Sequence, residues 1–369
     1  MGISSALGSS ALLPAGLGFR NLVINGAMTI DQRNAGAAVT GQTTNFFCVD
    51  RFICSPNSFG IFTAQQTTNS SLSGSQLNEF KNSLGLTVTT ARTPASGDVY
   101  GIRHRVEGNN CYQLAWGTSS AKQVVLSFWV RSSVTGTYSV AFFNAAGNRS
   151  YVATYTINSA NTWEYKTVMV MGDVTGTWAK DNTTGIEIFW DLGTGSTYET
   201  SAGSWQTGIY VRTSASAKWI SNAGATFYIT GVQLEQNYQP TPFEQRPIGV
   251  ELQLCQRYYY RMNSGNAYTR FALGTAHTAD NAYPTFQLPV QMRATPTGLD
   301  TSAMSTFLMY NSSGANFNTP TSIGANSADQ SPVTLTLVVT KIGAYTATYA
   351  YQLIGNNTTS AYIGVSAEL

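Results

Sequence analysis

The chain has 369 residues, of which 43 % are apolar and only 10 % are charged, and 20 basic and 18 acidic residues leave a net charge of +2. This length allows one large β domain or two smaller ones, with enough apolar residues for a sizeable core. No run of Lys or Arg exceeds two neighbours, so we expect neither a basic stripe for nucleic acid nor a polybasic patch for a membrane. Aromatic residues reach 12 %, so the scarcity of charge does not indicate disorder.

The N-terminal segment differs in composition from the rest of the chain. Residues 2–18 are rich in Ala, Ser, Gly and Leu, and their longest apolar run is too short to cross a membrane. The segment also lacks the positively charged start of a secretory signal. We therefore expect residues 1–20 to form an extended arm that becomes ordered only against a partner.

Side chains that alternate with a period of two predict β-strands along most of the chain. In residues 100–107, for example, Ile102, His104 and Val106 would share one face. Further strands are expected at residues 124–131, 137–144, 149–157, 163–171, 185–192 and 227–235. Many short strands separated by Gly- and Asn-containing turns indicate an all-β sandwich or jelly roll for residues 21–238.

Prolines mark a connector at residues 239–257. Pro247 and Gly249 precede a stretch with apolar residues at helical spacing, which predicts a short helix at residues 250–258. Alternating segments between residues 258 and 369 then predict a smaller, β-rich C-terminal domain. Residues 301–330 are rich in small residues and are expected to form mainly a surface loop region.

The four cysteines are Cys48, Cys54, Cys111 and Cys255, and their spacing matches no metal-binding or redox motif. Buried free thiols are the favoured interpretation, which fits assembly in a reducing cytoplasm. Cys48 and Cys54 fall on one expected strand, where they would share a face but lie too far apart to form a disulfide.

Three sequence stretches follow one another in a defined order. The first is NLVINGAM at residues 21–28, followed by DQR at 31–33 and DRF at 50–52. The second is FYITGVQLE at 227–235 with TPFEQR at 241–246, and the third is ELQLCQRYY at 251–259. Together they resemble fibre and virion structural proteins of tailed bacteriophages, which have a jelly roll akin to carbohydrate-binding modules and a β-rich tip.

This resemblance implies a non-enzymatic virion protein that assembles in the bacterial cytoplasm as a homo-oligomer, with a trimer expected. The arm, through Leu12, Leu13 and Pro14, would attach to other virion proteins, and the protein would act as a tail fibre that recognises host-surface glycan. A capsid-mounted fibre or decoration protein without receptor binding is the alternative. A polysaccharide-degrading enzyme is a further alternative, because a fold does not determine a function.

Related carbohydrate-binding modules often carry two acids that help to hold a structural calcium ion. Here Ala27 and Gly231 occupy those places, so no metal or other cofactor is expected, although Glu235 and Asp31 remain possible oxygen ligands.

The densest aromatic cluster, Tyr258, Tyr259 and Tyr260, places rings on both faces of an expected strand, next to Arg257. Such a strand must be covered on both sides, either at a threefold axis or at a domain junction. Glu244 and Arg246 would share a face and could bridge neighbouring chains. These six residues are therefore the candidates for an oligomer interface.

Sugar rings pack their C–H faces on indole rings, so tryptophans outside the most apolar strands are candidates for glycan binding. Trp116, Trp178 and Trp205 are the first candidates, ahead of Trp190 and Trp219. Trp178 and Trp205 lie in loops rich in small residues and are expected to be the more exposed, although packing beneath a loop is an alternative. Trp129 and Trp163 lie in apolar strands and are expected in the core.

Signs of catalysis are scarce. The two histidines have no other metal ligands at short spacing, and no hydrolase or phosphate-binding motif occurs. Glu187 and Asp191 could mimic a glycosidase pair, but a solvated sheet face is the favoured interpretation. We therefore assign no catalytic residue.

Overall fold

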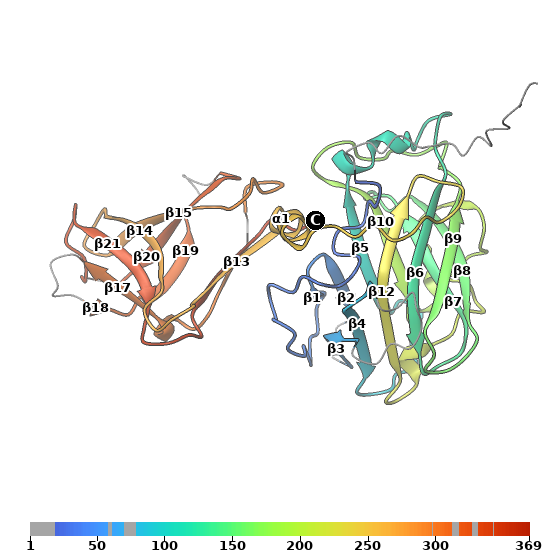
Figure 1. Ribbon diagram of the computed structural model, residues 1–369, viewed down its shortest axis with the longest axis horizontal. Helices are drawn as coiled ribbons and strands as arrows, with labels where there is room; N and C mark the ends of the chain where they lie inside the picture. Colours follow the sequence, from blue (N-terminus) through green and yellow to red (C-terminus); the bar gives the residue numbers. More distant parts are fainter. Residues whose placement is uncertain are drawn as a thin grey trace, which may run out of the picture.

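The computed structural model describes residues 19–57, 61–69, 79–296, 298–311, 317–326, 331–341 and 343–369. It has two β-rich lobes joined by a single short α-helix (Figure 1). The expected all-β class, with a sandwich followed by a smaller β-rich domain, is confirmed.

The first lobe consists of two antiparallel sheets that pack face to face. The seven-stranded sheet has, in spatial order, β1 (Phe46–Val49), β2 (Phe52–Ser55), β5 (Gly101–Glu107), β10 (Thr184–Asp191), β7 (Gly136–Phe143), β8 (Arg149–Ile157) and β11 (Trp205–Thr207). The five-stranded sheet has β3 (Phe62–Thr68), β4 (Asn82–Val88), β12 (Thr226–Glu235), β6 (Val124–Ser132) and β9 (Glu164–Val170). Short 3-10 turns η2 (Gly108–Asn110), η3 (Tyr112–Leu114), η4 (Ser196–Tyr198) and η5 (Trp219–Ser221) lie in the connections.

The core of this lobe lies between the two sheets and follows the period of two. In β6 the side chains of Leu126, Phe128 and Val130 are fully buried and point inward. Phe128 meets Trp190 of β10 across the core, with ring centroids 5.9 Å apart. Aromatic rings from both sheets therefore help to fill the sandwich core.

The outer faces of the two sheets differ. A second apolar cluster that includes Phe143, Phe189 and Val211 covers the outer face of the seven-stranded sheet, beneath the chain around residues 198–211. The outer face of the five-stranded sheet instead carries partly exposed side chains such as Trp129 and Tyr165. The outer face of the five-stranded sheet is thus the less covered of the two.

The segment with Cys48 and Cys54 is a hairpin of β1 and β2, and not one strand. The chain reverses at Asp50 and Arg51, where Arg51 has φ of +72°. The two sulfur atoms lie 2.9 Å apart as free, buried thiols. The expectation that these cysteines are too far apart to bridge is therefore wrong, because a turn brings them onto neighbouring strands.

The second lobe follows α1 (Ile248–Gln256). A three-stranded sheet has the order β13 (Tyr259–Asn263), β22 (Tyr362–Ser366) and β16 (Gly298–Thr301). A seven-stranded sheet has the order β18 (Phe317–Asn318), β17 (Phe307–Asn311), β21 (Ala350–Gly355), β14 (Arg270–Ala276), β15 (Asn281–Gln287), β20 (Thr334–Thr340) and β19 (Ser322–Ala325). The 3-10 turn η6 (Met304–Thr306) precedes β17. Residues 301–330, expected to be mainly a surface loop, therefore also contain β17 and the two edge strands, β18 and β19.

The second lobe has its own core, which includes Phe307, Leu337, Val339, Tyr351 and Leu353. Its residues come from both sheets of the lobe. Among the described residues, no helix is long and apolar enough to cross a bilayer.

Candidate functional site

One partly exposed aromatic surface of the first lobe lies on the outer face of the five-stranded sheet. Trp129 of β6 is paired with Tyr165 of β9, and their ring centroids lie 5.3 Å apart at an angle of 47°. Tyr165 is 41 % exposed and Trp129 is half-buried. These rings form one wall of a concavity of about 390 Å³, which we call the sheet pocket. Its lining comprises Glu79, Phe80, Ser127, Trp129, Tyr165, Gly231, Pro240, Thr241, Pro242 and Phe243.

Gly231 shapes the floor of the sheet pocket. The register of β12 shifts between Thr230 and Gln233, which marks a bulge, and Gly231 has φ of +60°. A Cβ atom at residue 231 would lie 2.7 Å from Cζ of Phe80. Because Gly231 has no side chain, the Phe80 ring can pack directly on the strand. There it contacts Phe243 edge-on, with ring centroids 4.9 Å apart.

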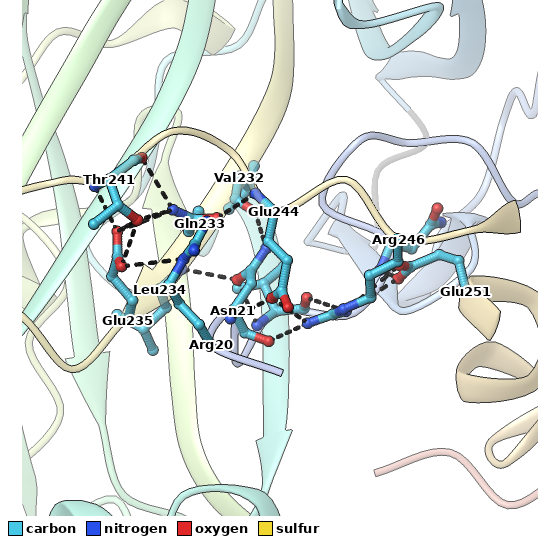
Figure 2. Close-up of polar contacts among 12 residues, drawn as sticks. Arg20, Asn21, Val232, Gln233, Leu234, Glu235, Thr241, Glu244, Arg246 and Glu251 are labelled. Carbon is cyan, nitrogen blue, oxygen red and sulfur yellow. Dashed lines mark hydrogen bonds and ion pairs between the residues drawn. The ribbon is translucent and has the colours of Figure 1, made fainter. Parts of the chain in front are cut away.

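The opposite wall comes from the connector after β12, which a hydrogen-bond network holds against the sheet (Figure 2). The Glu235 carboxylate accepts the Thr241 backbone N–H at 2.8 Å and the Thr241 hydroxyl at 2.7 Å. Gln233 Oε1 accepts the backbone N–H of Glu244 at 2.8 Å. These bonds fix the intervening prolines and Phe243, so the pocket is formed before any ligand arrives.

This network does not suit a calcium ion. The side-chain N–H₂ of Gln233 donates to Glu235 Oε1 at 2.9 Å and also points at the Thr241 carbonyl oxygen, so a donor occupies the place where a cation would sit. Asp31 lies elsewhere and accepts the backbone N–H groups of Asn34 and Gly36. No cluster of three or more His, Cys, Asp or Glu ligands occurs among the described residues.

The chemistry of the sheet pocket suits a neutral, hydroxylated ring. Aromatic and proline surfaces provide the apolar contact area, while Ser127 and Thr241 provide hydroxyl groups, and no basic side chain lines it. Neither the Trp129 nor the Tyr165 side chain is hydrogen-bonded to a residue that the structure describes, so the indole N–H and the phenol hydroxyl remain available to a ligand.

Trp116, Trp178 and Trp205 do come together, but mostly below the surface. Their ring centroids are 4.7, 5.3 and 5.4 Å apart in edge-to-face contacts. Trp116 is 4 % exposed and Trp178 is 7 % exposed, so the expected exposure of Trp178 is wrong. The cavity beside these two rings is about 10 Å³, which is the space of one water molecule and admits no sugar ring.

Trp129 and Trp163 were expected in the core, yet both are only half-buried on the outer face. The sequence carries a signal for Trp129, because Leu126, Phe128 and Val130 fix one phase of β6 as inward. Ser127 and Trp129 fall in the opposite phase, which points to the surface.

The six residues predicted to form an oligomer interface are already engaged within one chain. Tyr258 and Tyr259 are 0 and 1 % exposed, at the junction of the two lobes, and Tyr260 packs against the second core. Glu244 and Arg246 bridge each other at 3.3 Å, beside Asn21 (Figure 2). The domain-junction alternative therefore explains the tyrosines. Leu12, Leu13 and Pro14 lie outside the described residues.

Glu187 and Asp191 form no acid pair in a cleft. Glu187 accepts hydrogen bonds from Arg103 at 2.9 Å and Arg105 at 2.7 Å. Asp191 is fully buried near Arg212, and its burial raises its pKa to about 6. The expectation of a solvated sheet face is wrong, because the loops of this lobe cover that side of β10.

No protein-family model matches the chain, and no curated protein matches it at a significant level. Among solved structures, a candidate sugar binding protein from Bacteroides thetaiotaomicron is 13 % identical over 59 % of this chain and all of its own, with a TM-score of 0.32. A family 4 carbohydrate-binding module is 11 % identical over 58 % of this chain and 99 % of its own, with a TM-score of 0.30.

The enzymatically active domain of tailspike protein 4 of Bacteriophage CBA120 is 14 % identical over 59 % of this chain, with a TM-score of 0.29. The match spans only 22 % of the tailspike chain. Because all these TM-scores lie below 0.5, the likeness is too weak to assign a family, a ligand or an activity.

Proposed function

We propose that the protein is a non-enzymatic, glycan-binding structural protein of a tailed-phage virion, and that the sheet pocket is the glycan site of its first lobe. The observation that carries this proposal is the pocket itself, which is preformed and bounded by Trp129, Tyr165 and Phe243. The three-part sequence resemblance supports the virion role. The buried, paired state of Glu187 and Asp191 supports binding over catalysis.

The bound ring would lie against Trp129 and Tyr165 with its C–H face. Ser127 would hydrogen-bond its hydroxyl groups, and the Thr241 oxygen, whose proton is donated to Glu235, would accept from them. Such stacking contributes to binding affinity by burying apolar surface and by the attraction of sugar C–H groups to the electron-rich face of the aromatic ring. Because no basic side chain lines the pocket, a neutral sugar unit fits it better than an acidic one.

The test is binding of the full chain to an array of neutral bacterial oligosaccharides. Trp129→Ala and Tyr165→Ala should each weaken binding by about tenfold or more, since each removes one stacking surface. Trp163→Ala is the matched control, because Trp163 packs against Tyr228 on the same sheet face but does not line the pocket. Unchanged binding by both pocket variants, or equal loss in the control, would contradict the proposal.

The same proposal includes a homotrimer attached through the N-terminal arm. Light scattering after size-exclusion chromatography should give three times the mass of the chain, and a stable monomer at micromolar concentration would count against it. Electron microscopy of labelled virions distinguishes a tail fibre from a capsid-mounted decoration protein. Release of sugar from surface polysaccharide, abolished by Glu187→Gln, would instead favour an enzyme.

A further inference from the structure

The second lobe has a concavity of its own on the outer face of its seven-stranded sheet. It measures about 380 Å³ and is lined by Tyr268, Arg270, Tyr310, Gln352 and Ile354. These residues come from β17, β21 and β14, which are neighbours in the sheet, and from the turn before β14. We call it the lobe-2 pocket. It shares no lining residue with the sheet pocket of the first lobe.

Strand register explains how the lobe-2 pocket is built. Tyr351 and Leu353 of β21 point into the core, so Gln352 and Ile354 point outward. Ile354 pairs with Arg270 of β14, and Gln352 pairs with Tyr310 of β17. Ile354 nevertheless is only 6 % exposed, because the side chains around it rise above the sheet. Ile354 is therefore an apolar floor, and the larger side chains are the walls.

One wall is a tyrosine held at the rim. Tyr268 is 52 % exposed, and its backbone N–H donates to the Asn266 side chain at 3.1 Å. The Asn266 N–H in turn donates to the Thr269 hydroxyl at 3.1 Å, which closes the turn before β14. The ring is therefore presented by an ordered turn, and Tyr310 lies on the other side of the floor.

Arg270 supplies the charge of the pocket. Its Nε–H donates to Gln352 Oε1 at 2.8 Å, which fixes the plane of the guanidinium group. No ion pair or second hydrogen bond joins the Arg270 side chain to a residue that the structure describes. Its two terminal nitrogens therefore present a flat pair of donors, the geometry that binds both oxygens of a carboxylate.

We propose that the lobe-2 pocket binds a carboxylated sugar. The ring would rest on Ile354 between Tyr268 and Tyr310, and its carboxylate would receive two hydrogen bonds from the terminal nitrogens of Arg270. Gln352 acts as a positioning residue, because its contact with Nε orients the guanidinium group. No acidic residue lines this pocket, so nothing in its lining repels the anion.

This inference extends the proposed glycan role to a different ligand class, but it uses separate residues and can fail separately. The sheet pocket contains Glu79 and no basic residue, whereas the lobe-2 pocket contains Arg270 and no acid. The two lobes would thus recognise neutral and acidic units, which a heteropolysaccharide presents together.

The test is calorimetric titration of the full chain with glucuronic acid- and sialic acid-ended oligosaccharides, each beside its carboxyl-reduced counterpart. The acidic forms should bind at least about tenfold more tightly than the reduced forms, because reduction leaves the Arg270 donors without their acceptor. Arg270→Gln should remove this preference. Arg270→Lys should restore little of it, because an ammonium group cannot replace the two parallel donors.

Two controls keep the outcomes separate. Lys341→Gln removes a charge from the same lobe outside the pocket and should leave acidic-sugar binding unchanged. Trp129→Ala should weaken neutral-sugar binding only, so failure of the sheet pocket does not affect this test. Equal affinity for acidic and reduced forms, no binding of either acidic probe, or an unaffected Arg270→Gln variant whose fold is intact would each overturn the inference.

Discussion

At the scale of single residues, Glu107 accepts three hydrogen bonds across the lobe junction. Its carboxylate accepts two hydrogen bonds from Arg257, at 2.7 and 3.0 Å, and one from the Tyr258 hydroxyl at 2.7 Å. Burial opposes ionisation of this carboxyl, but the bonds from Arg257, Tyr258 and Asn109 outweigh it and hold the pKa of Glu107 below its ordinary value.

The change Glu107→Gln should therefore destabilise the protein at neutral pH. We expect a loss of about 3 kcal/mol in the free energy of unfolding, because the charge of Arg257 then loses its buried partner. A lowered pKa means that the stabilisation is present above the ordinary pKa of the carboxyl and is lost as the pH falls through the folded-state value. Urea unfolding at pH 7 and pH 3 measures both effects.

In this experiment the difference between wild type and Glu107→Gln should shrink at the lower pH. Asp280→Asn is the control, because Asp280 is an exposed carboxylate with no junction contact and the asparagine oxygen can still accept the Gly343 backbone N–H, so this change should leave the unfolding midpoint unchanged. A gap between wild type and Glu107→Gln that is the same at both pH values would show that the carboxylate charge contributes nothing.

At the scale of elements, Trp116, Trp178 and Trp205 hold three separate segments of the first lobe together. Trp116 follows η3, Trp178 lies in the loop before β10, and Trp205 lies on β11. Their indole N–H groups also tie segments together, as Trp116 donates to the Lys122 carbonyl and Trp205 to the Met171 carbonyl, both at 2.8 Å. The cluster therefore closes one edge of the sandwich.

Trp116→Ala should lower the free energy of unfolding by about 3–5 kcal/mol, the cost of removing a large buried ring. Glycan affinity of the folded fraction should stay unchanged, since Trp116 does not line the sheet pocket. Urea unfolding and oligosaccharide titration measure the two quantities. Tyr112→Ala, a neighbouring aromatic that is 59 % exposed, should change neither. If Trp116→Ala instead lost glycan affinity while its free energy of unfolding stayed normal, the tryptophan cluster would again be the candidate glycan site.

Strands in which polar and apolar residues alternate regularly could be predicted from the sequence, whereas strands without this pattern could not. Residues 149–157 coincide with β8, because inward and outward positions there differ clearly in polarity. The β1–β2 hairpin was missed because its turn depends on a distant contact. Arg51 adopts a left-handed conformation while its guanidinium group binds Glu368, which lies 317 residues away. No local pattern reports such a contact.

The sheet pocket shows a similar limit. Its aromatic residues come from four separate segments, at Phe80, Trp129, Tyr165 and Phe243, and only the folded sheet brings them together. The phase of β6 could have shown that Trp129 faces outward. The closure of the pocket depends on the bulge at Gly231, which the sequence showed only as the absence of an expected acid.

At the scale of the whole molecule, polar contacts join the two lobes that Figure 1 shows. Gln32 of the first lobe donates to the Tyr259 carbonyl at 2.7 Å. Arg293 of the second lobe donates to the Asn182 carbonyl, and the Asn182 side chain donates back to the Arg293 carbonyl, both at 2.8 Å. Because these contacts are partly buried, salt screens them less than surface pairs.

At the junction, two arginine side chains also stack on tyrosine rings. The guanidinium carbon of Arg51 lies 3.6 Å from the centroid of the Tyr258 ring, and that of Arg33 lies 3.5 Å from the Tyr259 ring. Both arginines also bind Glu368, so each tyrosine is held by charge and by packing. The two pockets should therefore keep a constant separation, as a rigid two-site surface requires.

We expect wild-type protein to unfold in one calorimetric transition, because separating the lobes leaves buried charges without partners. The double variant Arg51→Met, Arg257→Met removes two of these contacts and should split the transition in two. Small-angle scattering should then give a larger radius of gyration below the first transition. Arg270→Gln is the control, because it removes an exposed arginine outside the junction and should preserve one transition. Two transitions in the wild type would show that the lobes are already independent, and that the junction orders their orientation without coupling their stability.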